Sequence, residues 1–156
     1  MAGMNDVYGK PGHLIRRAQQ IAVAIFMEEC AAFDLTPVQY ATLVAVRDNP
    51  DADATRLSAL VAYDRSTLGL VIARLEKKGF LARKPGKDDK RTKRLILTRS
   101  GDTLLRRAEP VVQRSQERIL APLDTKAREQ LMALLGQLVE LNNESSRVPL
   151  RLVAAQ

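Results

Sequence analysis

The residues nearest the start of the chain that could do chemistry form a polar stripe. Spacings of three and four residues place its members on one face of a helix, and they are His13, Arg16, Arg17 and Gln20. An arginine beside an amide or imidazole can hold a carboxylate through paired hydrogen bonds, while an aromatic ring of the ligand packs against Phe26 or Tyr40. One interpretation of the stripe is therefore a site that binds a carboxylate group. The alternative is that the two arginines form ion pairs at a subunit interface while His13 caps the helix entrance.

A second set of candidate residues is basic and lies in the middle of the chain. Residues 64–99 include 12 basic and 4 acidic side chains, a net charge of +8, whereas the remainder of the chain has a net charge of −1. A charge that only kept the protein soluble would be spread more evenly, so this concentration indicates a polyanionic partner. Because an isolated charge run is more often a solvated surface, the interpretation depends on which elements carry it.

The chain has few residues of the types that catalysis or metal binding would need. His13 and Cys30 are the only histidine and the only cysteine, and one helix holding both would separate them by more than about 20 Å. The carboxylate pairs at 28–29 and 88–89 are adjacent rather than opposed across a cleft. We therefore expect no enzymatic activity, no metal site and no cofactor. Cys30 lies on an apolar stripe, which favours a buried packing thiol over an exposed oxidant sensor.

The N-terminal half of the chain is predicted to be helical. Apolar residues at helical spacing indicate a long first helix over 13–33. A second helix over 37–47 is indicated by Thr36-Pro37-Val38-Gln39, which supplies an N-cap, a first-turn proline and a capping-box glutamine. A short third helix is expected over 54–62.

The fourth helix, over 65–78, is the one expected to contact the polyanion. Asp64 caps its start and Gly79 ends it. Its inner face is apolar, with Leu68, Val71, Ile72 and Leu75. Two β-prone runs follow at 80–83 and 93–97, and the charged segment between them predicts a hairpin with a basic tip. A helix-turn-helix followed by such a hairpin is a winged helix, whose second helix enters the major groove of DNA.

This arrangement assigns different tasks to the exposed residues. Arg65 and Thr67 are the candidates for base readout. The residues expected to hold phosphates are Ser66, Arg74, Lys77 and Lys78. An arginine at the hairpin tip would enter the minor groove, and Asp89 would orient a neighbouring guanidinium group through a charge-assisted hydrogen bond. The full set of predicted DNA-binding residues is Arg65, Ser66, Thr67, Gly69, Arg74, Lys77, Lys87, Lys90, Arg91 and Lys93.

Two further helices are expected toward the C-terminal end. Thr98 caps the first of them, and Pro110 inside it predicts a kink or a local break before Pro122 ends the helix. Asp124 caps the second, which carries a stripe of leucines: Leu131, Leu134, Leu135, Leu138 and Leu141. The segment after residue 145 is expected to be frayed or to depend on a partner.

The first and last helices carry apolar stripes too wide for a winged helix to bury. A second copy of the chain could cover them, and since helix-turn-helix proteins commonly dimerise to match two half-sites, we expect a homodimer. The alternative is a monomeric helical bundle. We thus expect one unit over 1–156, with a DNA-binding part over 36–98 and dimerisation helices over 12–34 and 99–146.

Composition narrows the class of protein further. A chain of 156 residues with 46% hydrophobic residues is expected to form one domain with an ordinary core. Aromatic residues make up only 4% and tryptophan is absent, which argues against a base-stacking binder of RNA or single strands. The sequence shows no signal-peptide pattern and no apolar run near the roughly 18 residues of a membrane span, so we expect a cytoplasmic protein with no membrane partner.

Residues 64–81, and in particular Arg74-Leu75-Glu76-Lys77-Lys78-Gly79, resemble the MarR family of transcriptional regulators, as do Asp89-Lys90-Arg91 and the run 95–101. The resemblance covers nearly the whole chain. It implies a mainly α fold with a small two-stranded β-wing, in which a helical dimerisation layer from the N- and C-terminal helices carries winged helix-turn-helix units. The wing departs from the family's frequent Asp-Arg-Arg only at Lys90.

The resemblance also implies a function. Family members read pseudo-palindromic operators as dimers, and many release DNA on binding a small phenolic or aromatic acid. The segment 12–21 is similar to the opening of members that control aromatic-acid catabolism, which implies an aromatic carboxylate or its coenzyme A thioester as the effector. We therefore expect a sequence-specific regulator that binds double-stranded DNA and acts as a repressor. The alternatives are a nonspecific architectural DNA-binding protein and a winged helix that binds protein.

Overall fold

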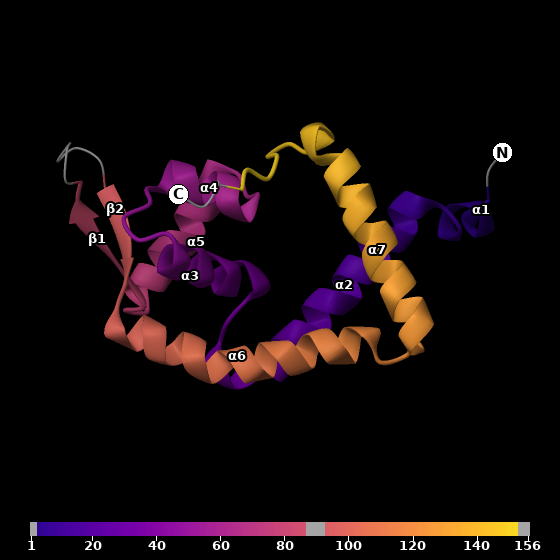
Figure 1. The fold of residues 1–156 in the computed structure, drawn as a ribbon, viewed down its shortest axis with the longest axis horizontal. Coiled ribbons are helices and arrows are strands. Elements are labelled where there is room, and N and C mark those ends of the chain that lie inside the picture. The colour runs from indigo at the N-terminus through magenta and orange to yellow at the C-terminus, as the bar shows by residue number, and fades with distance from the viewer. Residues whose placement is uncertain (1–2, 87–92, 153–156) are drawn as a thin grey trace.

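The computed structural model describes residues 3–86 and 93–152. Helices make up most of it, and the strands form one antiparallel hairpin (Figure 1). In chain order the elements are α1 (Met4–Tyr8), α2 (Pro11–Glu29), the 3₁₀ helix η1 (Ala31–Phe33), α3 (Pro37–Asp48), α4 (Ala54–Val61), α5 (Arg65–Lys77), β1 (Leu81–Pro85), β2 (Lys93–Leu97), α6 (Arg99–Leu120), α7 (Thr125–Leu141) and the 3₁₀ helix η2 (Asn143–Ser145). The predicted fold class, mainly α with a small two-stranded wing, is confirmed.

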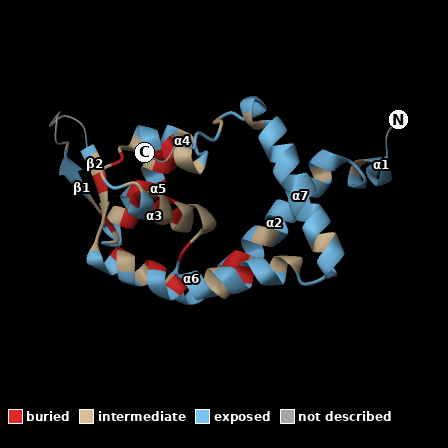
Figure 2. Ribbon diagram, in the orientation of Figure 1, coloured by how far each residue is buried: buried red, intermediate tan, exposed pale blue. Residues whose placement is uncertain are grey.

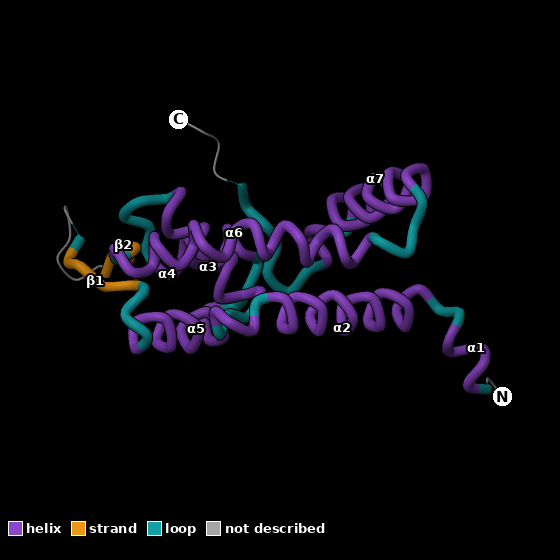
Figure 3. The backbone as a smooth tube through the Cα atoms, turned by 90° about the horizontal axis from the view of Figure 1, so that it is seen from below, coloured by secondary structure: helices purple, strands orange, loops and turns teal. Residues whose placement is uncertain are grey.

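The elements are arranged in a ring (Figure 1). On one side α3, α4, α5 and the hairpin form a compact group, and α6 leads from the base of the hairpin toward α7. On the other side lie α7 and α2, and the chain after α7 returns toward α4. In the view of Figure 3, α1 extends outward from the start of α2.

The hydrophobic core lies mainly within the group of α3, α4, α5 and the hairpin (Figure 2). Leu43 from α3 and Leu57 from α4 are fully buried in it. α5 contributes the four residues predicted for its inner face, which are Leu68, Val71, Ile72 and Leu75. Leu95 on β2 and Leu105 on α6 complete the core. Since burying one such side chain contributes about 2 kcal/mol, the hairpin and the first turns of α6 are firmly attached to the helices.

Side-chain caps define where the helices begin, and the predicted caps are confirmed. Thr36 forms the capping box at the start of α3. Asp64, Thr98 and Asp124 each accept a hydrogen bond from the backbone of the third residue of α5, α6 and α7, respectively. Gly79 has a φ of +76°, and this left-handed conformation lets the chain leave α5 and enter β1.

The hairpin is tied to its surroundings at its base. β1 and β2 pair in antiparallel fashion with Leu81 opposite Leu97. The backbone N–H of Leu95 donates to the carbonyl of Ala52 at 3.0 Å, which fixes β2 to the loop before α4. Gly101 is buried where α6 begins, and a Cβ there would collide with the carbonyl oxygen of Phe80. The start of α6 therefore lies directly against the backbone that leads into β1.

The first long helix is shorter than predicted. α2 ends at Glu29, and a 3₁₀ turn followed by Asp34, at a left-handed φ of +49°, redirects the chain toward α3. Phe33 still packs against the core, so the apolar spacing continues through the break and periodicity alone could not locate it. The short helix α1, which has no buried residue, gives no periodic signal and was not predicted.

α6 is a single helix of 22 residues, and Pro110 does not break it. Because Pro110 is exposed, its ring leaves intact the packing of Leu105, Ala108 and Ser115 on the buried face. The two ends of the Arg118 guanidinium pair with Glu28 and Glu29, each at 2.9 Å, and join α6 to α2. Residues 146–152 are not frayed, because they return toward α4, where the N–H of Arg151 donates to the carbonyl of Ala59. The alternative expectation, that this segment depends on a partner, stays a prediction.

Candidate nucleic-acid interface

α5 has one apolar face that is buried and one polar face that is exposed. The exposed face brings together five of the predicted residues: Arg65, Ser66, Thr67, Arg74 and Lys77. The buried face packs against α3 and α4. Within the described residues, Arg65, Arg74 and Lys77 form no ion pair. Their charges are therefore available to a partner, and a single helix fits the major groove of DNA, which is about 12 Å wide.

The start of α5 is fixed by Asp64. Its carboxylate accepts hydrogen bonds from the backbone N–H of Thr67 at 2.9 Å and from the Thr67 hydroxyl at 2.7 Å. Both bonds lower the pKa of the Asp64 carboxyl, so it is ionised at neutral pH. Because the Thr67 hydroxyl donates its hydrogen bond to Asp64, it can act toward DNA only as an acceptor. The Thr67 methyl group remains available for an apolar contact.

Sequence reasoning missed Leu70, which lies on the same exposed face of α5. Its side chain is 63% exposed, and the four-residue spacing of Ser66, Leu70 and Arg74 places it between two predicted DNA-binding residues. An apolar side chain in this position can contact a thymine methyl group in the major groove. The signal was present in the sequence, because Leu70 falls outside the periodic set that forms the buried face.

Gly69 lies in the interior of α5, where packing within the chain does not require a glycine. A Cβ added at this position would meet no atom within 4 Å, and glycine in a helix interior costs about 1 kcal/mol relative to alanine. Close approach of an outside surface, such as the edge of a nucleic acid, would account for it.

Several other basic residues of the segment are used inside the fold. Lys78 Nζ lies 2.6 Å from Oδ2 of Asp34 and joins the end of α5 to the turn before α3. Arg83 pairs with Glu76 at 3.0 Å. Arg94, whose side chain is only 16% exposed, donates to the backbone of β1 at 3.0 Å. Lys78, which was expected to hold a phosphate, is thus engaged with Asp34 instead.

Both strands of the wing are described, up to the pair of Pro85 with Lys93 next to the tip. Lys93 at the start of β2 is exposed and pairs in register with Pro85 of β1, and Lys84 is exposed beside it. The end of the hairpin that leads to the tip therefore carries exposed positive charge. The predicted tip residues Lys87, Asp89, Lys90 and Arg91 lie outside the described residues, so their roles stay predictions.

The polar stripe of α2 lies on the surface of the molecule. Arg16, Arg17 and Gln20 are exposed and His13 is half-buried. Arg17 Nη1 donates to Gln20 Oε1 at 3.1 Å, and Arg16 Nη2 lies 3.4 Å from His13 Nδ1. The stripe is thus organised as two hydrogen-bonded pairs. The ring of Tyr8, which sequence reasoning missed, lies 5.4 Å from the His13 ring.

The aromatic pair predicted for the same site lies elsewhere. Phe26 is buried, and its ring centroid is 6.2 Å from that of the half-buried Tyr40. Burial raises the pKa of the Tyr40 hydroxyl, and the charge of Glu109 adds to the shift. The stripe residues are hydrogen-bonded to one another, and the Phe26 ring lies against that of Tyr40. A ligand site shared by the stripe and the aromatic pair stays a prediction.

Cys30 is fully buried, as expected for a packing thiol. Burial raises the pKa of this thiol above its ordinary value of 9.0, and the nearby Glu29 adds to the shift. Within residues 3–86 and 93–152, no three His, Cys, Asp or Glu side chains are placed to hold a metal ion. In the same ranges no helix combines the length and apolarity needed to cross a membrane.

α7 exposes its leucine stripe to solvent. The exposed members are Leu131, Leu134, Leu135, Leu138 and Leu141. Leu14 and Ile15 of α2 are exposed as well, and they line an apolar hollow of about 480 Å³ together with the stripe. A contiguous apolar surface of this kind on one chain is typical of a protein interface.

Comparisons with known proteins agree with this geometry. The MarR family model matches residues 35–93, which run from just before α3 to the start of β2. The HTH-type transcriptional repressor NicR of Pseudomonas putida is 30% identical over 135 residues, covering 86% of this chain and 85% of NicR.

Two solved structures are similar to this fold over most of the chain. BpsR of Bordetella bronchiseptica, studied for the regulation of its DNA binding by 6-hydroxynicotinic acid, has a TM-score of 0.78 at 29% identity, covering 84% of this chain and 94% of BpsR. The transcriptional repressor CouR, bound to a 23-mer DNA duplex, has a TM-score of 0.80 at 26% identity, covering 89% of this chain and 99% of CouR. With the winged helix, the flanking helices and these likenesses in agreement, the chain belongs to the MarR family of winged helix-turn-helix transcriptional regulators.

Proposed function

We propose that this protein is a sequence-specific repressor that binds double-stranded DNA as a homodimer and leaves a pseudo-palindromic operator when a small aromatic acid, or its coenzyme A thioester, binds. The exposed face of α5 carries the proposal. Arg65, Arg74 and Lys77 make no ion pair with any described residue, and the opposite face of the helix is fixed in the core. A helix held in this way can enter a major groove and present its side chains to base edges.

We place the DNA-binding part on residues 36–98 and the dimer interface on 12–34 and 99–146. The exposed leucines of α7, with Leu14 and Ile15 of α2, support this placement because a second chain would remove them from water. The group of α3, α4, α5 and the hairpin has its own core, so these leucines are not needed to fold it.

Release from DNA follows from the geometry of such a dimer. The two α5 helices must lie about 34 Å apart, one turn of DNA, to enter successive major grooves. An effector that binds better to a dimer with another spacing shifts the population away from the DNA-competent form. A hundredfold loss of DNA affinity requires a difference of only about 2.8 kcal/mol in effector binding to the two forms.

The effector class is supported by the relatives and by the polar stripe of α2. The DNA binding of BpsR is regulated by 6-hydroxynicotinic acid. In this chain Arg17 already donates to the amide oxygen of Gln20 at the surface, so a carboxylate could take the place of that acceptor. His13 and Arg16 form the second pair beside it. A ring held there would meet Tyr8 rather than Phe26 or Tyr40.

The test of DNA recognition is selection of bound duplexes from a random double-stranded library. We expect enrichment of an inverted repeat whose half-site centres lie about ten base pairs apart. Salt-sensitive binding without enrichment would favour a nonspecific architectural protein instead. Absence of any binding would assign the basic segment to another anionic partner.

The test of the effector site uses the selected repeat and a panel of aromatic acids and their coenzyme A thioesters. Compounds that release the wild-type protein should lose their effect on Arg17→Ala. Gln19→Ala is the matched control, because Gln19 is also exposed on α2 but lies outside the stripe. An unchanged response of Arg17→Ala to every effector would show that the carboxylate clamp is misplaced, while leaving the DNA-binding proposal intact.

A further inference from the structure

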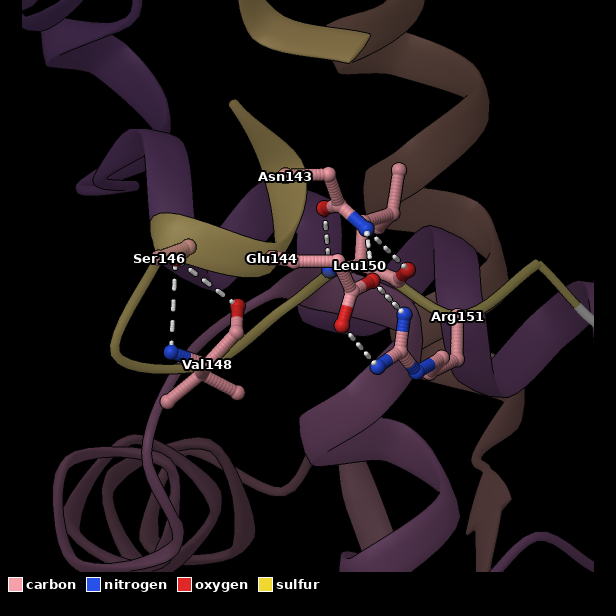
Figure 4. Close-up of polar contacts among 6 residues, drawn as sticks. All are labelled: Asn143, Glu144, Ser146, Val148, Leu150 and Arg151. Carbon is pink, nitrogen blue, oxygen red and sulfur yellow. Dashed lines mark hydrogen bonds and ion pairs between the residues drawn. The ribbon is translucent and has the colours of Figure 1, made fainter. Parts of the chain in front are cut away.

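The chain after α7 forms a short strap, residues 143–152, with its own polar contacts (Figure 4). The side-chain amide of Asn143 pairs with the backbone of Leu150, since Oδ1 accepts from the Leu150 N–H at 2.8 Å and Nδ2 donates to the Leu150 carbonyl at 3.2 Å. The Ser146 hydroxyl bridges the N–H and carbonyl of Val148 at 3.3 and 3.1 Å. Both carboxylate oxygens of Glu144 accept hydrogen bonds from the guanidinium of Arg151.

The strap ends on α4, the helix that precedes α5. The backbone N–H of Arg151 donates to the carbonyl of Ala59 at 3.0 Å. Val148 lines an apolar hollow of about 550 Å³ that is bounded by α2, α7 and Ala62, the residue after α4. The strap therefore connects the end of α7 to the DNA-binding part of the same chain.

This connection closes the ring seen in Figure 1. α6 joins the hairpin to α7 covalently, and the strap joins α7 back to α4 through noncovalent contacts. The strap is joined to α4 by the backbone hydrogen bond from Arg151 to Ala59. The Glu144–Arg151 ion pair lies within the strap, its side chains are 73% and 56% exposed, and an ion pair between exposed groups contributes little to stability. The strap can therefore open without unfolding the core, which contains none of its residues.

We propose that the strap holds the winged helix at one orientation relative to α7, and that Asn143 is its positioning residue. The inference rests on the proposed function, because it assumes a dimer that reads two half-sites. A winged helix held by the strap meets the second half-site already oriented. A released winged helix loses more orientational entropy on binding and accommodates other separations of the half-sites.

The experiment uses the full-length protein and the inverted repeat recovered from the duplex selection. Copies of that repeat are made with the half-sites moved together or apart by one base pair, about 3.4 Å. Asn143→Ala removes both side-chain hydrogen bonds to Leu150. We expect its affinity for the selected repeat to fall by about three- to tenfold, and its preference for that repeat over the shifted copies to fall as well.

Asn5→Ala is the matched control. Asn5 is exposed on α1, outside the strap and outside the segments placed in the DNA-binding part and the dimer interface. This variant should keep the wild-type affinity and spacing preference. Glu144→Gln, a change at the surface, should act in the same direction as Asn143→Ala with a smaller effect, and it decides the outcome if Asn143→Ala lowers the unfolding temperature.

The outcomes separate the strap from the proposed function. Weaker binding of Asn143→Ala with an unchanged spacing preference would overturn the strap proposal, since a merely structural loss lowers affinity for all repeats alike. An equal loss of spacing preference in Asn5→Ala would overturn it too. Failure of the wild-type protein to enrich any inverted repeat would contradict the proposed function instead.

Discussion

The exposed side chains of α5 differ in what they can offer to a base or to a phosphate. Arg65 carries a planar guanidinium that can donate twice to guanine, whereas Lys77, near the other end of the helix, carries a point charge. Arg65→Ala should cost about 1–3 kcal/mol of discrimination and relax the preference at one base pair, while Lys77→Ala should weaken binding to all sequences and lower the salt slope by about one. Competition titrations at several salt concentrations measure both effects. Equal losses of specificity in the two variants would contradict this division.

Gly69 offers a way to separate stability from DNA binding. Gly69→Ala should raise the free energy of unfolding by about 0.5–1 kcal/mol, because alanine favours the helix and its methyl group meets no atom of the chain. The same methyl group should lower DNA affinity by about tenfold if DNA approaches α5 closely there. Urea unfolding and a DNA titration on one preparation give both numbers. Unchanged DNA affinity would show that no close approach occurs at this position.

Cys30 should make the protein less stable in alkaline solution. Burial raises the pKa of the folded thiol above 9.0, so the folded state holds this proton more tightly than the unfolded state. The stabilisation is complete below the unfolded pKa and is lost as the pH rises through the folded pKa. The free energy of unfolding should thus fall more steeply with rising pH in alkaline solution in the wild type than in Cys30→Ala. An equal fall of the free energy of unfolding with pH in the two proteins would contradict a raised pKa at Cys30. Tyr40 is present in both proteins, so its titration does not affect the comparison.

At the scale of single residues, the sequence predicted the charged face of α5 but not its complete surface. Arg65, Arg74 and Lys77 could be placed outside because charged groups are rarely buried. Leu70 has the residue type of a core position, and only its register relative to Leu68 and Val71 shows that it faces solvent. The engagement of Lys78 with Asp34 spans 44 residues, and no local pattern in the sequence encodes it.

At the scale of elements, the starts of helices were predictable and some of the ends were not. Thr36, Asp64, Thr98 and Asp124 act through hydrogen bonds three residues away, so the sequence alone is enough to locate them. The end of α2 at Glu29 depends on the reversal of the chain toward α3, which is a tertiary requirement. The apolar periodicity extended past this point and gave the wrong boundary.

A charge placed on the leucine stripe of α7 should weaken the dimer. The double variant Leu134→Asp, Leu138→Asp places two carboxylates on its exposed leucine stripe. Burying them between two chains is unfavourable, so the dissociation constant of the dimer should rise by at least about a hundredfold. The helical circular dichroism should remain largely intact, because the core of the winged helix does not include α7.

Sedimentation velocity at micromolar concentration measures this shift in oligomeric state. Gln130→Asp is the control, because Gln130 is exposed on α7 and does not line the hollow against α2. A double variant that keeps the wild-type mass would exclude the α7 stripe from the interface.

At the scale of the whole molecule, the closed ring was the feature that the sequence did not predict. The segment after residue 145 has few apolar residues at regular spacing and was expected to fray. Its order depends on one amide, Asn143, that pairs with a backbone seven residues away, and on the contact of Arg151 with Ala59. The contact with Ala59 depends on where α4 and α7 lie in space, which no local pattern specifies.

The contact between Gly101 and Phe80 makes α6 a lever. Because glycine has no side chain to hold the two backbones apart, the hairpin and α6 are joined as one arm. The 22 residues of α6 give this arm a length of about 33 Å. A turn of about 6° at the α7 end would displace the hairpin end by about 3.4 Å, the rise of one base pair. A small rotation at the α7 end is therefore amplified along α6 into a displacement of the wing as large as one base-pair step of DNA.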